Sequence, residues 1–152
     1  MAQLNGYRLG FYKQTGESNG WNGACATIFD DKNGTVSGAV YELDLKHLPS
    51  LDDQEGVNKN IYAPLVKEVI TSDGKVLECR TYQMSGAPTD ELNLSDPNIP
   101  FERKPSKTYM DVILRGSEES QLPQEYQNFL RNIVHNGNLA SQELLDKLFG
   151  NY

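Results

Sequence analysis

The sequence predicts a single α+β domain, because strand-like segments fill its first half and helix-like segments fill its last third. Short apolar stretches typical of strands occur at residues 7–12, 24–29, 36–43, 62–71 and 75–84. Beyond residue 105, apolar residues recur at the spacing of a helix face. A length of 152 residues suits one domain, residues 1–152, and is short for two. Strands that precede helices favour an antiparallel or mixed sheet.

Two dipeptides predict the turns that join these strands. Asn33-Gly34 lies between the segments 24–29 and 36–43, and Asp73-Gly74 lies between 62–71 and 75–84. Gly adopts the positive φ that a tight hairpin turn requires, so each dipeptide favours a hairpin. We therefore expect two hairpins in the first half of the chain.

Residues 44–56, which connect the two predicted hairpins, favour a short helix. Asp44 is a suitable N-cap, and three leucines follow at helical spacing. Pro49 shortens or bends the helix, and Gly56 ends it. The helix finishes in an acidic cluster formed by Asp52, Asp53 and Glu55.

The segment 85–105 predicts a long loop, because it contains four prolines and little apolar periodicity. Long loops without structure of their own are uncommon, so we expect a mobile segment or a lid. Helices are expected after it: one over 106–115, one that begins at Pro123 and that Gly137 can close, and a short one that Ser141 caps.

Composition narrows the classes of partner and compartment. The net charge of −7 gives no general attraction to phosphate backbones, so we expect no nucleic-acid partner. No apolar run reaches the ~18 residues of a membrane span, and the N-terminal residues lack the apolar stretch of a secretory signal. We therefore expect a soluble cytoplasmic protein that does not bind membranes.

The cysteines and histidines do not form a recognisable metal motif. Cys25 and Cys79 lie in apolar stretches and not in a C-x-x-C pair, which favours two buried free thiols over a disulfide. His47 and His135 stand at no usual zinc spacing from them. We expect no metal site.

The chemically suggestive residue is Glu55, beside Gly56 at the acidic end of the short helix. Phosphate-binding, dinucleotide-binding and serine-nucleophile motifs do not occur in the sequence. A glutamate at this place can act as a general base if burial raises its pKa toward neutrality. The residue types alone favour the alternative, a solvated acidic turn, and they favour core positions for Tyr62 and Tyr109.

A series of short motifs runs through about residues 7 to 135. The first half contains W-N-G-A-C-A-T-I at 21–28, G-A-V-Y at 38–41, and L-D-D-Q-E-G-V at 51–57 followed by Tyr62. The second half contains C-R-T-Y-Q-M at 79–84, P-S-K-T-Y at 105–109, Gly116, and L-P-Q-E-Y at 122–126. These motifs and their order resemble the γ-glutamylcyclotransferase family, and the L-D-x-Q-E-G-V form resembles its amino-acid-specific branch.

The resemblance implies a mixed β-barrel or sheet with helices packed around it, often as a homodimer. It implies release of 5-oxoproline from small γ-glutamyl substrates, without metal or organic cofactor. By the matching motifs, Glu55 would be the catalytic acid/base and Tyr109 would contact the substrate. Tyr62 matches a tyrosine near the catalytic glutamate and is the second candidate for substrate binding.

The family's N-terminal motif does not occur in this sequence. Family members begin with a strand ending in Y-G-S-N-L, a loop that holds the glutamyl group, so we expect the fold without this first strand and loop. Loss of one oxyanion donor typically costs about 10²- to 10³-fold in rate. The alternatives are an enzyme that supplies these contacts from residues 85–105 or a partner chain, a truncated product of an active parent, or a catalytically impaired homologue that acts as a binding module.

Overall fold

The computed structural model describes residues 1–13 and 19–150. They fall into two compact units along the chain. The first unit holds Met1–Leu9 and Thr27–Ala87, and the second holds Gly10–Ala26 and the chain from Pro88 onward. No helix in the described part of the chain is both long enough and apolar enough to cross a membrane.

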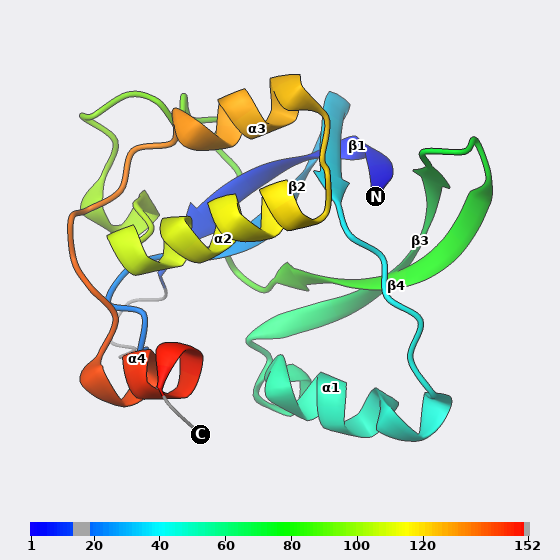
Figure 1. Ribbon diagram of the computed structural model, residues 1–152, viewed down its shortest axis with the longest axis horizontal. Coiled ribbons are helices and arrows are strands. Elements are labelled where there is room, and N and C mark those ends of the chain that lie inside the picture. Colours follow the sequence, from blue (N-terminus) through cyan, green and yellow to red (C-terminus); the bar gives the residue numbers. More distant parts are fainter. Residues whose placement is uncertain (14–18, 151–152) are drawn as a thin grey trace. The chain divides into compact units, whose positions relative to one another are not determined.

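Within residues 1–13 and 19–150, four strands form one sheet in the order β2-β1-β3-β4. The strands are β1 (Ala2–Tyr12), β2 (Cys25–Gly38), β3 (Tyr62–Thr71) and β4 (Val76–Met84), drawn as arrows in Figure 1. The pairs β1–β3 and β3–β4 are antiparallel, with Ala2 opposite Thr71 in the first pair. The resemblance implied either a mixed β-barrel or a sheet. The described strands form an open sheet.

The hairpin predicted at Asp73-Gly74 is confirmed. Strands β3 and β4 pair along their whole length, from Tyr62 opposite Met84 to Ile70 opposite Val76. Gly74 has a φ of +83° and donates its backbone N–H to the Thr71 carbonyl oxygen at 2.9 Å. The positive φ explains why the turn requires glycine at this position.

The hairpin predicted at Asn33-Gly34 is wrong. Strand β2 runs through this dipeptide without a turn and ends at Gly38, so residues 39–43, predicted as strand, lie outside it. Gly34 does not adopt a positive φ. A Cβ atom there would lie 2.8 Å from the carbonyl carbon of Tyr7 in β1. Glycine therefore allows close approach of two strands at this position and does not form a turn.

The first unit has its own apolar core between the strands. Val69 of β3 is 5% exposed and packs with residues of β1 and β2. Side chains also connect β2 to β4, the first and last strands in this order. The Thr27 hydroxyl of β2 accepts the Met84 N–H of β4 at 2.8 Å. Gln83 donates to the Ile28 carbonyl oxygen at 3.0 Å. The core consists of Ala2, Leu4, Ile28 and Val69, with Tyr7, Val36, Leu65 and Cys79 packed against it.

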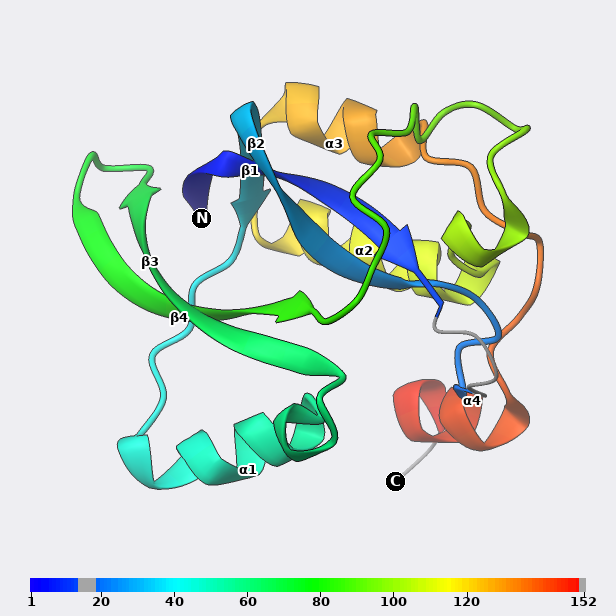
Figure 2. The ribbon, with the colours of Figure 1, turned by 180° about the vertical axis from the view of Figure 1, so that it is seen from behind.

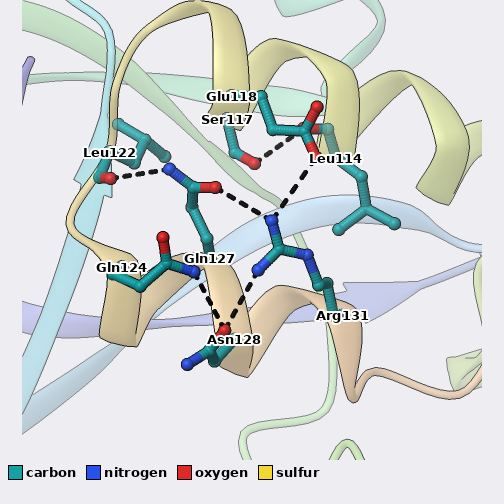
Figure 3. Close-up of polar contacts among 8 residues, drawn as sticks. All are labelled: Leu114, Ser117, Glu118, Leu122, Gln124, Gln127, Asn128 and Arg131. Carbon is teal, nitrogen blue, oxygen red and sulfur yellow. Dashed lines mark hydrogen bonds and ion pairs between the residues drawn. The ribbon is translucent and has the colours of Figure 1, made fainter.

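The α-helices in the described part of the second unit are α2 (Lys107–Glu119), α3 (Gln124–Arg131) and α4 (Gln142–Phe149). The cap predicted at Ser141 is confirmed, since its hydroxyl accepts the Leu144 N–H at 3.3 Å. Figure 3 shows polar contacts around these two helices: the Arg131 guanidinium of α3 donates to Glu118 of α2 at 3.4 Å, and within α3 it donates to Gln127 at 3.1 Å. Exposed contacts of this kind contribute little individually.

Helix α3 is shorter than predicted. It ends at Arg131, so Ile133, Val134 and the predicted closing residue Gly137 lie beyond it. Gly137 does have a positive φ, +81°, but it lies in a later turn. The Val134 N–H donates to the Leu94 carbonyl oxygen at 2.9 Å, which takes the chain out of the helix.

The segment predicted as a loop contains the short 3₁₀ turn η3 (Phe101–Arg103) and otherwise no helix or strand. Its part within the second unit is anchored by Arg103, which is 5% exposed. Arg103 donates to the Phe11 carbonyl oxygen at 2.9 Å and to an Asp90 carboxylate oxygen at 2.8 Å. Leu94 and Ile99 are buried alongside. These contacts hold the part of residues 85–105 that belongs to the second unit.

Candidate functional site

The short helix predicted in residues 44–56 is confirmed, in two parts. A 3₁₀ turn, η1 (Leu45–His47), leads into helix α1 (Leu48–Gln54). The Asp44 carboxylate accepts the Lys46 N–H at 3.1 Å, which confirms the predicted cap. Pro49 occupies the first turn of α1, where its missing N–H leaves no intrahelical bond unmade. Figures 1 and 2 both show α1 beside the β3–β4 hairpin of the same unit.

Glu55 caps the C-terminus of α1, and Gly56 turns the chain away from the helix. The Glu55 backbone N–H donates to the Leu51 carbonyl oxygen at 3.0 Å. Gly56 has a φ of +69°, the left-handed conformation that commonly ends helices. The next turn, η2 (Val57–Lys59), is closed by the Ile61 N–H, which donates to the Gly56 carbonyl oxygen at 3.1 Å.

The Glu55 side chain is half-buried. Burial removes water from the carboxylate, disfavours its charged form, and raises the pKa of Glu55 above its ordinary value. A carboxyl group whose pKa moves toward neutrality is better matched to exchange protons at physiological pH. The local environment of Glu55 is thus of the kind that a general acid/base needs.

Asp52, one turn earlier in α1, has the opposite environment. The Tyr82 hydroxyl donates to Asp52 Oδ1 at 2.5 Å, and the Arg80 guanidinium donates to both carboxylate oxygens at 3.1 and 2.7 Å. The hydrogen bond from Tyr82 and, after it, those from Arg80 hold the pKa of Asp52 below its usual value against the effect of burial. Two carboxyl groups near the end of one helix therefore have pKa values shifted in opposite directions.

Tyr62 is the first residue of β3, opposite Met84 of β4, and its side chain is half-buried. The η2 turn separates it from Glu55 in the chain. The Ser85 N–H donates to the Ile61 carbonyl oxygen at 2.9 Å and fixes this start of β3 to the end of β4. Glu55 and Tyr62 thus flank one hydrogen-bonded turn of the first unit.

Tyr109 belongs to the second unit, in the first turn of α2. Its hydroxyl oxygen accepts the Ala26 N–H at 2.8 Å. Its ring packs edge-on against Trp21, with ring centroids 4.8 Å apart, and against Phe11 at 6.1 Å. The Ser106 hydroxyl accepts the Tyr109 N–H at 3.1 Å and caps the helix. These contacts fix the orientation of Tyr109.

Gly23 explains the glycine of the W-N-G motif. A Cβ atom at Gly23 would lie 2.5 Å from the Ser106 backbone nitrogen and 3.0 Å from the Pro105 carbonyl carbon. The Asn22 carbonyl oxygen accepts hydrogen bonds from Asn136 at 3.0 Å and from Asn138 at 3.3 Å. The motif therefore packs backbone against backbone at the start of α2.

The pairing of Asp52 with Arg80 and Tyr82 is the feature of this site that the sequence interpretation missed. Arg80 and Tyr82 are two residues apart in β4, so their side chains point to the same face of the strand. An acidic residue in a short helix before the hairpin is a natural partner for that face. The two-residue spacing of Arg80 and Tyr82 in a predicted strand was the sequence signal that could have indicated this pairing.

The remaining candidates take no part in this arrangement. Cys25 and Cys79 are half-buried and form no disulfide in the described chain. His47 and His135 are exposed, and His135 Nδ1 accepts the Gly137 N–H at 3.0 Å. Within the described residues, no three His, Cys, Asp or Glu side chains are grouped so that they could hold a metal ion.

Comparison with known proteins identifies the family. Residues 35–130, more than half of the chain, match the model of the AIG2-like family. The chain belongs to the AIG2-like family. The family's match covers the Glu55 turn, the β3–β4 hairpin and helix α2.

The relatives confirm the resemblance to γ-glutamylcyclotransferases. The gamma-glutamylcyclotransferases of Bos taurus and Homo sapiens are 36% and 34% identical to the chain over 137 residues, which make up 90% of this chain. The chain spans 66% of the length of these curated relatives. A solved gamma-glutamyl cyclotransferase structure is similar with a TM-score of 0.81 and 31% identity, covering 99% of this chain and 83% of that one. The predicted α+β fold of this family is thereby confirmed.

Proposed function

We propose that the chain acts as a γ-glutamylcyclotransferase, which cyclises γ-glutamyl amino acids and releases 5-oxoproline and a free amino acid. The observation that carries the proposal is the half-buried Glu55 at the end of α1, whose pKa burial raises. Family membership and the identity to gamma-glutamylcyclotransferases support the reaction type. No metal or organic cofactor is needed for this chemistry, because the substrate supplies both nucleophile and electrophile.

The reaction is a transfer within one molecule. The α-amino nitrogen of the glutamyl group attacks the γ-carbonyl carbon, and a new C–N bond closes the five-membered ring. The bond from that carbon to the leaving amino group then breaks. Because both reacting groups belong to one substrate, the enzyme needs to fold the substrate and not to collect two molecules.

Glu55 is the proposed proton carrier. Its carboxylate accepts a proton from the α-ammonium group, which frees the lone pair for attack. The protonated Glu55 then donates that proton to the leaving nitrogen, and the second proton that the ring nitrogen gives up as the lactam forms ends on the released amine. The carboxylate is thus restored at the end of the cycle. A raised pKa serves both steps, because the group must gain and lose the same proton near neutral pH.

Tyr62 and Tyr109 are the proposed substrate-contacting residues. The motif matches support both assignments, and the contacts of Tyr109 within its own unit support a fixed orientation of its side chain. Their phenol groups combine a polar tip with an apolar ring, which suits the polar end and the aliphatic chain of a γ-glutamyl group. Tyr62→Phe and Tyr109→Phe are the corresponding tests.

The deciding experiment measures 5-oxoproline release from γ-glutamyl-alanine by purified protein. Glu55→Gln should lower the rate about 10²- to 10⁴-fold, the usual contribution of a general acid/base. Asp53→Asn is the matched control, since Asp53 is an exposed carboxylate next to the same turn. Equal rates for wild type and Glu55→Gln would remove Glu55 from the mechanism.

The wider assignments are part of the same proposal. We propose one γ-glutamylcyclotransferase-like domain over residues 1–152. A match of one relative to 90% of the chain supports this proposal. A cytoplasmic place in glutathione metabolism is included in the proposal because of the similarity to gamma-glutamylcyclotransferases. The substrate is a small molecule, and the net charge of −7 argues against nucleic acid as a partner.

A second candidate function, an interaction module, is favoured by an exposed apolar segment before α1. Tyr41, Leu43 and Leu45 are 77%, 58% and 82% exposed. Apolar side chains gathered on a surface are typical of sites that bind another protein, including a second copy of the chain. Sedimentation of wild type and of a Tyr41→Ser/Leu45→Ser variant tests this: a dimer that persists unchanged in the variant excludes this segment as the interface.

A further inference from the structure

Three side chains connect helix α1 to strand β4. Arg80 donates Nε to Asp52 Oδ1 at 3.1 Å and a terminal nitrogen to Asp52 Oδ2 at 2.7 Å, in the two-pronged geometry that suits guanidinium and carboxylate. The Tyr82 hydroxyl donates to Asp52 Oδ1 at 2.5 Å, and the Arg80 guanidinium lies 5.7 Å from the centre of the Tyr82 ring. We call these three residues the Asp52 clamp.

Helix α1 depends on such a connection because it is short and poorly buried. It contains seven residues, and none of them is buried. A helix of this length is marginal in water without tertiary contacts. Its half-buried side chains include two leucines and Asp52, so the clamp supplies the polar part of its attachment to the hairpin.

A hydrogen-bonded stretch of backbone joins the clamp to Glu55. The Glu55 N–H donates to the carbonyl oxygen of Leu51, the residue before Asp52, at 3.0 Å. The Gly56 N–H donates to the backbone carbonyl oxygen of Asp53 at 3.0 Å. Ile61 closes the following turn on Gly56, and Ser85 holds Ile61 to the end of β4. A shift of Asp52 relative to β4 is therefore transmitted to Glu55.

We propose that the Asp52 clamp is a positioning device that sets the place and the burial of the Glu55 carboxyl group for proton transfer. This inference rests on the proposed function. Asp52 accepts three hydrogen bonds from Arg80 and Tyr82, so its role is exerted through Glu55 and not on the substrate. Arg80 suits this role better than lysine would, because only the planar guanidinium engages both carboxylate oxygens at once.

The test compares Asp52→Asn, Arg80→Lys and Tyr82→Phe with wild type by two measurements. The first is kcat and KM for γ-glutamyl-alanine. The second is the titration midpoint of the Glu55 carboxyl carbon by ¹³C NMR, assigned by the signal that disappears in Glu55→Gln. A displacement of about 1 Å costs about 10²-fold in rate, so we expect kcat to fall roughly 10- to 100-fold in the first two variants with KM nearly unchanged.

The Glu55 midpoint should fall toward that of an ordinary glutamate in these variants, because a loosened α1 lets water reach the carboxylate. Tyr82→Phe keeps the ion pair and should give a smaller change in the same direction. Asp52→Glu, which retains a carboxylate, should recover part of the kcat lost in Asp52→Asn. Asp53→Asn removes the same charge from the same helix at an exposed position and should leave both measurements at wild-type values.

Each outcome decides the proposal. Folded Asp52→Asn and Arg80→Lys proteins with wild-type kcat and an unchanged Glu55 midpoint would overturn it. If wild type releases no 5-oxoproline, the proposed function fails, yet a midpoint that shifts in Asp52→Asn and not in Asp53→Asn still supports the clamp, and an unshifted midpoint refutes it. If Asp52→Asn does not fold, the comparison of Tyr82→Phe with wild type decides in the same way.

Discussion

Replacement of Gly56 by alanine should destabilise the protein more than the same replacement at Gly74. Both glycines have positive φ, +69° and +83°, so alanine at either position incurs the backbone cost of the left-handed conformation, about 1–2 kcal/mol. At Gly74 nothing lies within 4 Å of the new Cβ atom. At Gly56 the new atom would lie 2.8 Å from Ile61 Cδ1 and 3.0 Å from Ile61 Cβ.

Overpacking of this kind adds about 1–3 kcal/mol, so Gly56→Ala should cost about 3 kcal/mol in the free energy of unfolding. For a chain of this size, that loss corresponds to a fall in Tm of roughly 6–12 °C. Urea unfolding followed by circular dichroism measures both variants, and Ile61→Val in the Gly56→Ala background should recover part of the loss. Losses within about 0.5 kcal/mol of each other for Gly56→Ala and Gly74→Ala would refute the steric part of the reasoning.

Three further predictions concern charge and burial. Asp52, with its lowered pKa, contributes stability above about pH 4 that is lost as pH falls through its folded pKa, so the stability advantage of wild type over Asp52→Asn should shrink in acid urea titrations. Glu55 has a raised pKa, so its protonated form contributes to the stability of the folded state, and this contribution is lost as pH rises through the folded pKa. The free energy of unfolding of Glu55→Gln relative to wild type should therefore increase between pH 4 and pH 7. Arg103→Met should cost about 1–3 kcal/mol by leaving the buried Phe11 carbonyl oxygen without this donor, and a smaller loss in urea unfolding would contradict that account.

The features predicted correctly are those that local chemistry decides. Asp44 and Ser141 accept hydrogen bonds from nearby N–H groups at helix starts, and the Asp73-Gly74 turn depends on one positive φ. Each needs only a few neighbouring residues, so the sequence carries the information in one place. The strongly periodic helix α2 and the Glu55 turn were found for the same reason.

The features predicted wrongly depend on residues far apart in the chain. Gly34 looks like a turn residue until the approach of Tyr7 in β1 is known. Helix α3 stops before Gly137 because the Val134 N–H bonds to Leu94, in a segment that precedes α2. The partnership of Asp52 with Arg80 likewise spans two elements, and no local pattern specifies which acidic residue of the helix would bind there.

The register of the sheet has a consequence for the order in which the chain folds. Strands β3 and β4 are adjacent in sequence and are joined by the short turn at residues 72–75, whereas pairing of Ala2 with Thr71 must close a long loop. Local contacts form faster than distant ones, because less chain entropy is lost before the first contact stabilises. Arg80 and Tyr82 belong to that hairpin and bind Asp52, which lies three residues before Glu55. We therefore expect the surroundings of Glu55 to assemble early in folding, with the N-terminal strand arriving later. φ-values near zero at Asp73 and Gly74 and near one at Ala2 would reverse this order.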